Sequence, residues 1–315
     1  MKKTLLKFIL FIGAPLTFIA SLWMKFVIKV GIGNINDKIF MKIGILPIVD
    51  HYYEPMINPK KHLTKSLRDN RTLQGIDMNI EEQLRLLASF NYNEELLKFP
   101  LTQKNDSEFY YNNRSYCSGD SEYLYNIVRH FKPKRIIEIG SGNSTLMVRN
   151  AITKNKYFKN DYTCNHICIE PYEQSWLGKI DVDLIREKVE KLGTEFFQKL
   201  ESNDILFIDS SHIIRPQGDV LFEYLELLPT LKPGVLIHIH DIFTPKDYLN
   251  EWVYSHKLWN EQYLLEAFLT FNSNFKIIGA LNYLSHNFRK EFSAKCPIFE
   301  KQLGREPGSF WMVKK

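Results

Sequence analysis

The sequence has little cysteine, few glycines and prolines, and no strong excess of one charge. Only four cysteines occur in 315 residues. The pair Cys164 and Cys168 has no second close pair to complete a zinc site, so structural thiols in a reducing compartment are expected. Fifteen glycines and thirteen prolines are too few for a fibrous or low-complexity protein. A net charge of +5 is compatible with an anionic substrate or a membrane surface, but it does not argue for nucleic acid.

Long hydrophobic runs are also absent, except at the N-terminus. Residues 8–24 carry no charge, with Lys7 before them and Lys25 after them. This length is the lower limit for a membrane-spanning helix, and Pro15 lies in its middle. A signal peptide is an alternative, although the small-residue cleavage pattern is poor. We expect residues 1–30 to be a hydrophobic segment that packs on the protein or, through residues 5–30, lies on a membrane.

The next part of the chain is irregular. Residues 31–117 contain one helical pattern, at residues 80–90, among turn-rich stretches, and no repeat of fixed period. We predict an N-terminal extension or a cap over a later site.

From residue 118 onward, short apolar strands alternate with helical patterns. The expected strands lie at residues 135–139, 166–170, 183–189, 204–208, 235–239, 275–281 and 309–313. Helices are expected at residues 118–131, 145–152, 195–200, 217–228 and 259–271. This alternation predicts an α/β protein with a mostly parallel sheet and helices on both faces. Ligands of such sheets bind beyond the carboxyl ends of the strands.

Two features at these strand ends favour a nucleotide-type ligand. Gly140-Ser141-Gly142 follows the first strand directly, and Asn143 to Thr145 then opens a helix whose free N–H groups favour negative charge. Glu170 ends the second strand, where an acid can accept the hydroxyls of a ribose. Thr145 occupies the third small position of a dinucleotide fingerprint, so the loop by itself is weak evidence for NAD.

Ionisable side chains follow the next two strands. Asp209-Ser210-Ser211-His212 ends the fourth strand, and His240-Asp241 ends the fifth. One of the two histidines is a candidate general base for a hydroxyl. Alternatively, Asp209 and Asp241, with His240, are candidate ligands of a divalent cation that orients substrate oxygens.

The segments IIEIGSGNST, CIEP, DILFIDSSH and LKPGVLIHIHDIF, in this order, resemble a class I S-adenosylmethionine-dependent methyltransferase. The sequence is most similar to the O-methyltransferase-like branch known as methyltransferase domain family 24. The resemblance covers residues 118–315 and implies a Rossmann-like sheet of seven strands, the last one antiparallel. It implies S-adenosylmethionine as donor and a hydroxyl of a small molecule, sugar or glycan as acceptor. His240 replaces an acid or amide of the family's magnesium site, which weakens the case for Mg²⁺.

The resemblance and the strand-end positions together give the expected site. The donor-binding residues are Gly140, Ser141, Gly142, Asn143, Glu170, Val189, Glu190, Asp209 and Ser210. The catalytic candidates are His212, His240 and Asp241, and the metal candidates are Asp209 and Asp241. Candidates to shape the acceptor pocket are Tyr52, Tyr53, Tyr110, Tyr111, Trp259 and Tyr263.

Two other functions remain open at this point. One is an NAD-binding oxidoreductase of the Rossmann type, and the other is a non-catalytic, membrane-tethered scaffold. We expect a cytoplasmic protein, attached to the cytoplasmic face of a membrane if the N-terminal segment binds one.

Overall fold

The structure is a computed structural model that describes residues 2–172 and 174–315. The chain divides into two compact units, Met1–Lys65 and Ser66–Lys315.

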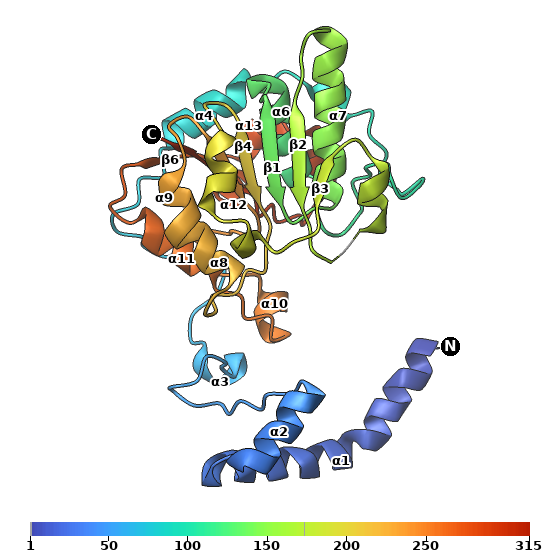
Figure 1. Cartoon of the computed structure of the whole chain (residues 1–315), viewed down its shortest axis with the longest axis vertical. Helices are drawn as coiled ribbons and strands as arrows, with labels where there is room; N and C mark the ends of the chain where they lie inside the picture. The colour runs from blue at the N-terminus through green and yellow to red at the C-terminus, as the bar shows by residue number, and fades with distance from the viewer. Residues whose placement is uncertain (1, 173) are drawn as a thin grey trace. The chain divides into compact units, whose positions relative to one another are not determined.

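The N-terminal unit is helical. It comprises α1 (Lys2–Val30), α2 (Gly33–Ile43) and the short α3 (Pro59–His62), and Figure 1 shows α1 as one long helix. Among the described residues, Lys3–Val30 is the one helix long and apolar enough to cross a membrane. None of its most apolar stretch is buried. A signal sequence passes the same test of length and composition.

The second unit is built on a sheet of seven strands, as predicted. The strands are β1 (Arg135–Ile139), β2 (Asn165–Ile169), β3 (Asp183–Ile185), β4 (Ile205–Ile208), β5 (Leu236–Ile239), β6 (Phe275–Ala280) and β7 (Phe310–Lys314). Their order is β3-β2-β1-β4-β5-β7-β6. All pairs are parallel except those of β7, which runs antiparallel to β5 and β6. Runs such as RIIEI and ILFI are buried on both faces, which explains why they do not alternate with polar residues.

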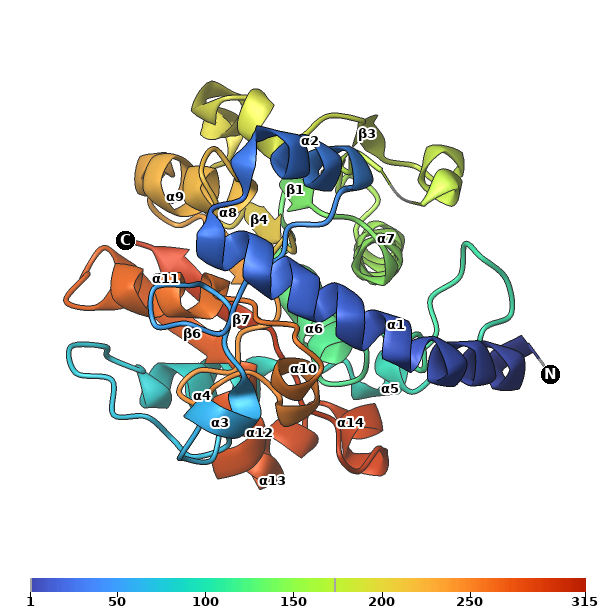
Figure 2. The same cartoon turned by 90° about the horizontal axis from the view of Figure 1, so that it is seen from below.

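Helices cover both faces of this sheet. The helices are α4 (Ile80–Ser89), α5 (Asn93–Leu96), α6 (Asp120–Phe131), α7 (Asn143–Phe158), α8 (Asp219–Leu221), α9 (Leu228–Thr230), α10 (Asn250–Tyr254), α11 (Glu261–Leu269), α12 (Leu281–Asn287), α13 (Arg289–Ser293) and α14 (Pro297–Lys301). Figure 2 shows α8, α9 and α11 on one side of the strands and α6, α7, α12 and α13 on the other. Each side has its own cluster of buried apolar side chains. The predicted α/β class, with helices on both faces, is confirmed.

Several predicted bounds differ from the structure. The third strand ends at Ile185, and Val189 lies in a 3-10 turn, Val189–Lys191. Helix α7 extends to Phe158, so part of the polar stretch after residue 154 is helical rather than an inserted loop. The helix expected at residues 217–228 contains a π-helical turn at Phe222–Leu227, and it continues past Pro229.

The predicted division at residue 118 does not coincide with the division between Lys65 and Ser66. Residues 66–117 pack onto the sheet unit because their aromatic side chains are buried there. Phe90, Phe109 and Tyr111 are fully buried in the same cluster as α6 and α7. Asn79 Nδ2 also donates a hydrogen bond to the carbonyl of Ile277 in β6, at 2.8 Å.

Candidate active site

The loop after β1 has a backbone that only glycine fits. Gly140 has φ +77°, and a Cβ there would collide with the backbone carbonyl of Asp209. The loop after β1 therefore lies directly against the end of β4. Gly142 differs, because a Cβ added to it would meet no atom within 4 Å.

Polar groups of this loop are tied to the end of β2. The backbone N–H of Ser141 donates to Glu170 Oε2 at 3.2 Å, and the N–H of Tyr172 donates to Glu170 Oε1 at 3.0 Å. The hydroxyl of Ser141 is buried and has no hydrogen-bond partner among the described residues. Buried polar groups are normally paired, so this hydroxyl is an exception among the buried groups of the loop.

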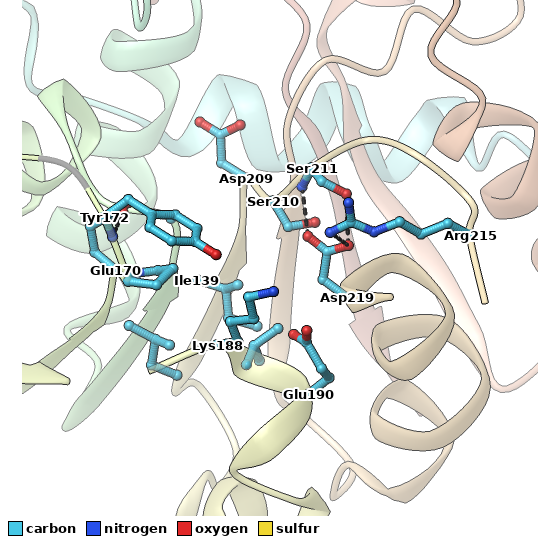
Figure 3. Close-up of a pocket in the computed structure, with 14 residues that line it drawn as sticks. Ile139, Glu170, Tyr172, Lys188, Glu190, Asp209, Ser210, Ser211, Arg215 and Asp219 are labelled. Atoms are coloured by element: carbon cyan, nitrogen blue, oxygen red, sulfur yellow. Dashed lines mark hydrogen bonds and ion pairs between the residues drawn. The ribbon is translucent and has the colours of Figure 1, made fainter. Parts of the chain in front are cut away.

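A cavity of about 230 Å³ opens at the carboxyl ends of β1, β2 and β4. Figure 3 shows Glu170 and Tyr172 on one side of it, Lys188 and Glu190 on a second, and Ser211, Arg215 and Asp219 opposite Tyr172. The predicted donor-binding residues that line it are Gly140, Glu170, Val189, Glu190, Asp209 and Ser210. Ser141, Gly142 and Asn143 are outside this lining. Asn143 instead donates to the hydroxyl of Ser115 at 2.8 Å, which ties the first turn of α7 to the segment before α6.

The strand-end acids and histidines meet beside this cavity, as the sequence predicts. His212 Nε2 lies 3.2 Å from Asp209 Oδ1 and 3.6 Å from Asp241 Oδ2. His240 Nδ1 lies 3.5 Å from Asp209 Oδ2 and 3.7 Å from Asp241 Oδ1. Asp209 therefore belongs both to the cavity wall and to this cluster, which we call the acid–histidine cluster (Asp209, His212, His240, Asp241).

Glu261 also contacts this cluster, and sequence reasoning missed it. Its Oε2 lies 2.7 Å from His212 Nδ1, and its Oε1 accepts a hydrogen bond from Tyr224 at 3.1 Å. The side chain is fully buried at the start of α11. An acid at the first position of an apolar helix is expected to stabilise the helix N-terminus. The sequence therefore gives no sign of its contact with His212, which only the tertiary structure reveals. The ring of Trp259 packs on His212, with centroids 4.2 Å apart. Tyr111, in contrast, is a core residue.

The charged groups of the acid–histidine cluster shift the pKa values of one another. Burial alone would lower the pKa of His212, but hydrogen bonds with Asp209 and Glu261 raise it well above 6.5. Burial likewise opposes a rise in the pKa of His240, which the charges of Asp241 and Asp209 nevertheless raise to about 10. The pKa of Asp209 is lowered, against the effect of burial, by both histidines. The cluster therefore holds protons on its histidines and negative charge on Asp209.

The donor atoms of this cluster are compatible with a cation. One ligand atom each from Asp209, His240 and Asp241 lies within 4.8 Å of the others. Two carboxylates and one imidazole suit a first-row transition metal better than Mg²⁺. A second group, Glu138, His166 and Cys168, is wholly buried, and Glu138 already accepts hydrogen bonds from the hydroxyls of Ser144 and Thr145. We therefore regard that group as structural.

Comparisons with known proteins agree with this arrangement. Residues 137–242 match the family model described as a methyltransferase domain. An uncharacterised protein of Archaeoglobus fulgidus is 32% identical over 182 residues, which cover 54% of this chain and 80% of that protein.

Solved structures give weaker likenesses. The plantazolicin methyltransferase BpumL in complex with SAH matches with TM-score 0.41 and 14% identity, over 76% of this chain and 97% of that one. The O-methyltransferase from Bacillus cereus, also in complex with SAH, gives TM-score 0.37 and 15% identity, over 82% and 95%. With TM-scores below 0.5, these likenesses carry no argument about this chain.

The domain match spans β1 to the end of β5 and so contains the glycine loop, Glu170 and the acid–histidine cluster. The chain belongs to the methyltransferase domain family, and it is an S-adenosylmethionine-dependent methyltransferase.

Proposed function

We propose that this enzyme methylates a hydroxyl group of a small molecule or a sugar or glycan. The observation that carries the proposal is the position of Asp209, which lines the donor cavity and contacts both histidines of the acid–histidine cluster. A group that can take a proton from a hydroxyl is thus adjacent to the expected donor. Methyl transfer needs this adjacency, because the acceptor oxygen must be aligned with the methyl group as it loses its proton.

The nine residues predicted to bind the donor are proposed to hold S-adenosylmethionine. Glu170 lines the cavity at the end of β2, where it is placed to accept ribose hydroxyls. Val189 and Glu190 lie on the cavity wall where the family resemblance expects the adenine. The donor supplies an activated methyl group on a positively charged sulfur.

His212 is the proposed general base. Glu261 holds its Nδ1 at 2.7 Å, which directs Nε2 toward Asp209 and Asp241. In the proposed step the acceptor oxygen bonds to the methyl carbon as the carbon–sulfur bond breaks. The sulfur keeps the bonding pair and becomes neutral, and the hydroxyl proton passes to His212. Neighbouring carboxylates raise the pKa of His212 and so hold a proton on it. The positive sulfur of the donor, bound beside Asp209, would lower the pKa of His212 again and favour the neutral form that can act as base.

A divalent cation is the second proposed means of activation. Asp209 and Asp241, with His240, would hold it, and it would lower the pKa of the acceptor hydroxyl and orient that oxygen. Treatment with a chelator distinguishes activation by His212 from activation by a cation, because activity that survives the chelator excludes the cation.

We further propose that α1 attaches the enzyme to the cytoplasmic face of a membrane. Most apolar side chains of Lys3–Val30 are exposed, with Val27 as a buried exception, and lysines flank the uncharged residues 8–24 on both sides. Substrates of the cell envelope are then within reach. A role in binding nucleic acid is not proposed.

Calorimetry on the full chain in detergent tests the donor assignment. We expect S-adenosylhomocysteine to bind and NAD not to bind. Glu170→Gln should weaken S-adenosylhomocysteine binding at least 10-fold, whereas Glu226→Gln, an exposed acid outside the cavity, should not. NAD binding without S-adenosylhomocysteine binding would sink the proposal. His212→Asn should keep donor binding and lose methyl transfer; a variant with full activity would exclude His212 as base and favour the cation.

A further inference from the structure

A second cavity lies on the other side of the acid–histidine cluster. It measures about 210 Å³ and is lined by residues from the segment before α6 and the start of α6, from the segment after β5, from α10, and from the segment before β7. His240 and Asp241 form part of its wall, while Asp209 lines the donor cavity. The cluster therefore lies between the two cavities. This volume is below the roughly 300–1,000 Å³ of sites for drug-sized ligands, so a small molecule, or the end of a longer one, fits.

Two arginines line this second cavity. Arg305 lies just before β7, and Arg114 lies in the segment before α6. The guanidinium of Arg305 donates only to neutral groups: Nε to Gln302 Oε1 at 3.2 Å, Nη2 to Asn112 Oδ1 at 3.3 Å, and Nη1 to Cys117 Sγ at 3.4 Å. Among the described residues, no carboxylate lies within ion-pair distance of it. Three neutral partners thus fix the position of the guanidinium, and no carboxylate among those described neutralises its positive charge.

Arg114 lines the same cavity from a loop that hydrogen bonds hold in a fixed conformation. Its φ is +71°, a left-handed conformation that is uncommon for a residue other than glycine. Asn113 fixes this turn, because its Oδ1 accepts from the N–H of Ser115 at 3.0 Å and of Tyr116 at 2.7 Å. Within the described part of the chain, the guanidinium of Arg114 has neither a hydrogen bond nor an ion pair. The loop thus presents a second positive charge, on an exposed side chain that solvent screens more than the half-buried Arg305.

The acids of the cavity do not cancel these charges. Glu306 is paired with Arg68 at 2.9 Å and with His286 at 2.9 Å. Asp120 accepts from the N–H of Ser309 at 2.7 Å, and burial raises its pKa to about 6. Asp241 belongs to the acid–histidine cluster. Glu251 is exposed at the start of α10, where solvent and salt screen its charge.

We propose that this second cavity is the acceptor site and that its substrate carries an oxyanion, a phosphate or a carboxylate. Arg305 and Arg114 bind the oxyanion, and the hydroxyl to be methylated reaches the acid–histidine cluster, whose His240 and Asp241 line the same cavity and whose His212 lies 3.6 Å from Asp241. Guanidinium groups match both oxyanions with paired hydrogen bonds. This inference rests on the proposed O-methylation. The inference further specifies the acceptor of that reaction as a charged compound, such as a sugar phosphate or a uronic acid, rather than a neutral one.

Binding of simple anions to the full chain, saturated with S-adenosylhomocysteine in detergent, tests the proposal. Inorganic phosphate and acetate are titrated separately by calorimetry, so that the two arms distinguish phosphate from carboxylate as the preferred group. We expect at least one of them to bind, Arg305→Gln to weaken it at least 10-fold, and Arg114→Gln to weaken it less. The matched control Arg85→Gln, an exposed arginine on α4, should bind as the wild type does. Glu251→Gln should leave anion binding unchanged or tighten it.

The outcomes separate this proposal from the proposed function. If neither anion binds, or if Arg305→Gln binds both as well as the wild type, the anionic acceptor is wrong although donor binding stands. If Arg305→Gln instead loses affinity for S-adenosylhomocysteine, the arginine belongs to the donor site and the proposal is overturned. Failure of the wild type to bind S-adenosylhomocysteine at all contradicts the proposed function itself.

A kinetic arm gives a second readout. Glucose 6-phosphate, glucuronate and glucose are offered with the methyl donor, and methylated product is measured by mass. For an accepted anionic sugar, Arg305→Gln should raise KM at least 10-fold with kcat changed less than threefold, as expected for a residue that binds a remote group. Turnover of glucose by the wild type with the same kcat/KM as glucose 6-phosphate and glucuronate would contradict the inference.

Discussion

At the scale of the residue, Gly140 decides whether the donor loop can form. Its φ of +77° and the nearby carbonyl of Asp209 leave no room for a side chain. We expect Gly140→Ala to lower the free energy of unfolding by about 1–3 kcal/mol, the usual cost of a strained backbone, and to weaken binding of S-adenosylhomocysteine. Urea denaturation and calorimetry measure the two effects. Gly142→Ala is the control for stability alone, because its Cβ meets open space; equal stability of the two variants would refute the role of Gly140.

His240 provides a prediction for the dependence of stability on pH. Burial alone would lower its pKa, but Asp241, Asp209 and Asp120 raise it to about 10. Because the folded pKa exceeds the unfolded value of 6.5, the protonated ring contributes stability that is fully present below pH 6.5. This contribution is lost as the pH rises through about 10.

The variant His240→Asn removes this contribution. The difference in unfolding free energy between wild type and variant should shrink between pH 6.5 and 10, by at most about 1.4 kcal/mol per pH unit. Urea denaturation at several pH values in one detergent measures it, with the exposed His256→Asn as control. A difference that stays constant over this range would show that the carboxylates do not hold a proton on His240.

At the scale of the element, a single carboxylate joins α6 to α14. Glu122 is fully buried, and it accepts hydrogen bonds from the backbone N–H groups of Ile298 at 2.7 Å and Phe299 at 2.9 Å. It also accepts from the N–H of Gly119 at 3.0 Å, at the start of its own helix. One side chain thus satisfies free N–H groups at the starts of two helices far apart in the sequence.

Glu122→Gln should therefore destabilise the sheet unit. An amide has only one oxygen to accept these bonds, and its NH₂ group would face a backbone donor. We expect a loss of about 1.5–3 kcal/mol, the range for hydrogen bonds to charged groups, measured as a lower midpoint of thermal unfolding. The control is Glu300→Gln, an exposed acid in α14. An unchanged midpoint for Glu122→Gln would mean that α14 is held by its apolar contacts alone.

The elements also show what sequence reasoning could and could not reach. Strands such as Arg135–Ile139 were predictable because buried parallel strands are short, β-branched runs, and their order placed Asp209, His212, His240 and Asp241 at one edge. The structure confirms that these four meet. Glu261 and Arg305 were not predictable, because each reaches its site from a segment outside the strand ends. For residues 31–117 the sequence predicts only an extension or a cap. The packing of residues 66–117 on the sheet unit was not predictable, because their aromatic side chains show no period that reveals the surface on which they pack.

At the scale of the whole molecule, the proposed membrane attachment depends on α1. Phe11 and Ile19 on this helix are 78% and 64% exposed, respectively, so changing them disturbs no core. In the centre of a membrane helix, each carboxylate costs about 2.5–3.5 kcal/mol. We expect the wild-type chain to stay with the membrane fraction through washes at high salt and at alkaline pH. The double variant Phe11→Glu and Ile19→Glu should move to the soluble fraction and keep its affinity for S-adenosylhomocysteine.

The matched control carries Phe11→Leu and Ile19→Leu, which keep the helix apolar, and it should remain with the membrane. High salt separates insertion from attraction between lysines and anionic lipids, because only the second is screened. Mass spectrometry of the purified chain separates an anchor from a signal sequence: an anchor leaves residues 1–30 in place, whereas cleavage removes them. A cleaved, soluble chain would contradict the proposal and would place the acid–histidine cluster outside the compartment that holds the methyl donor.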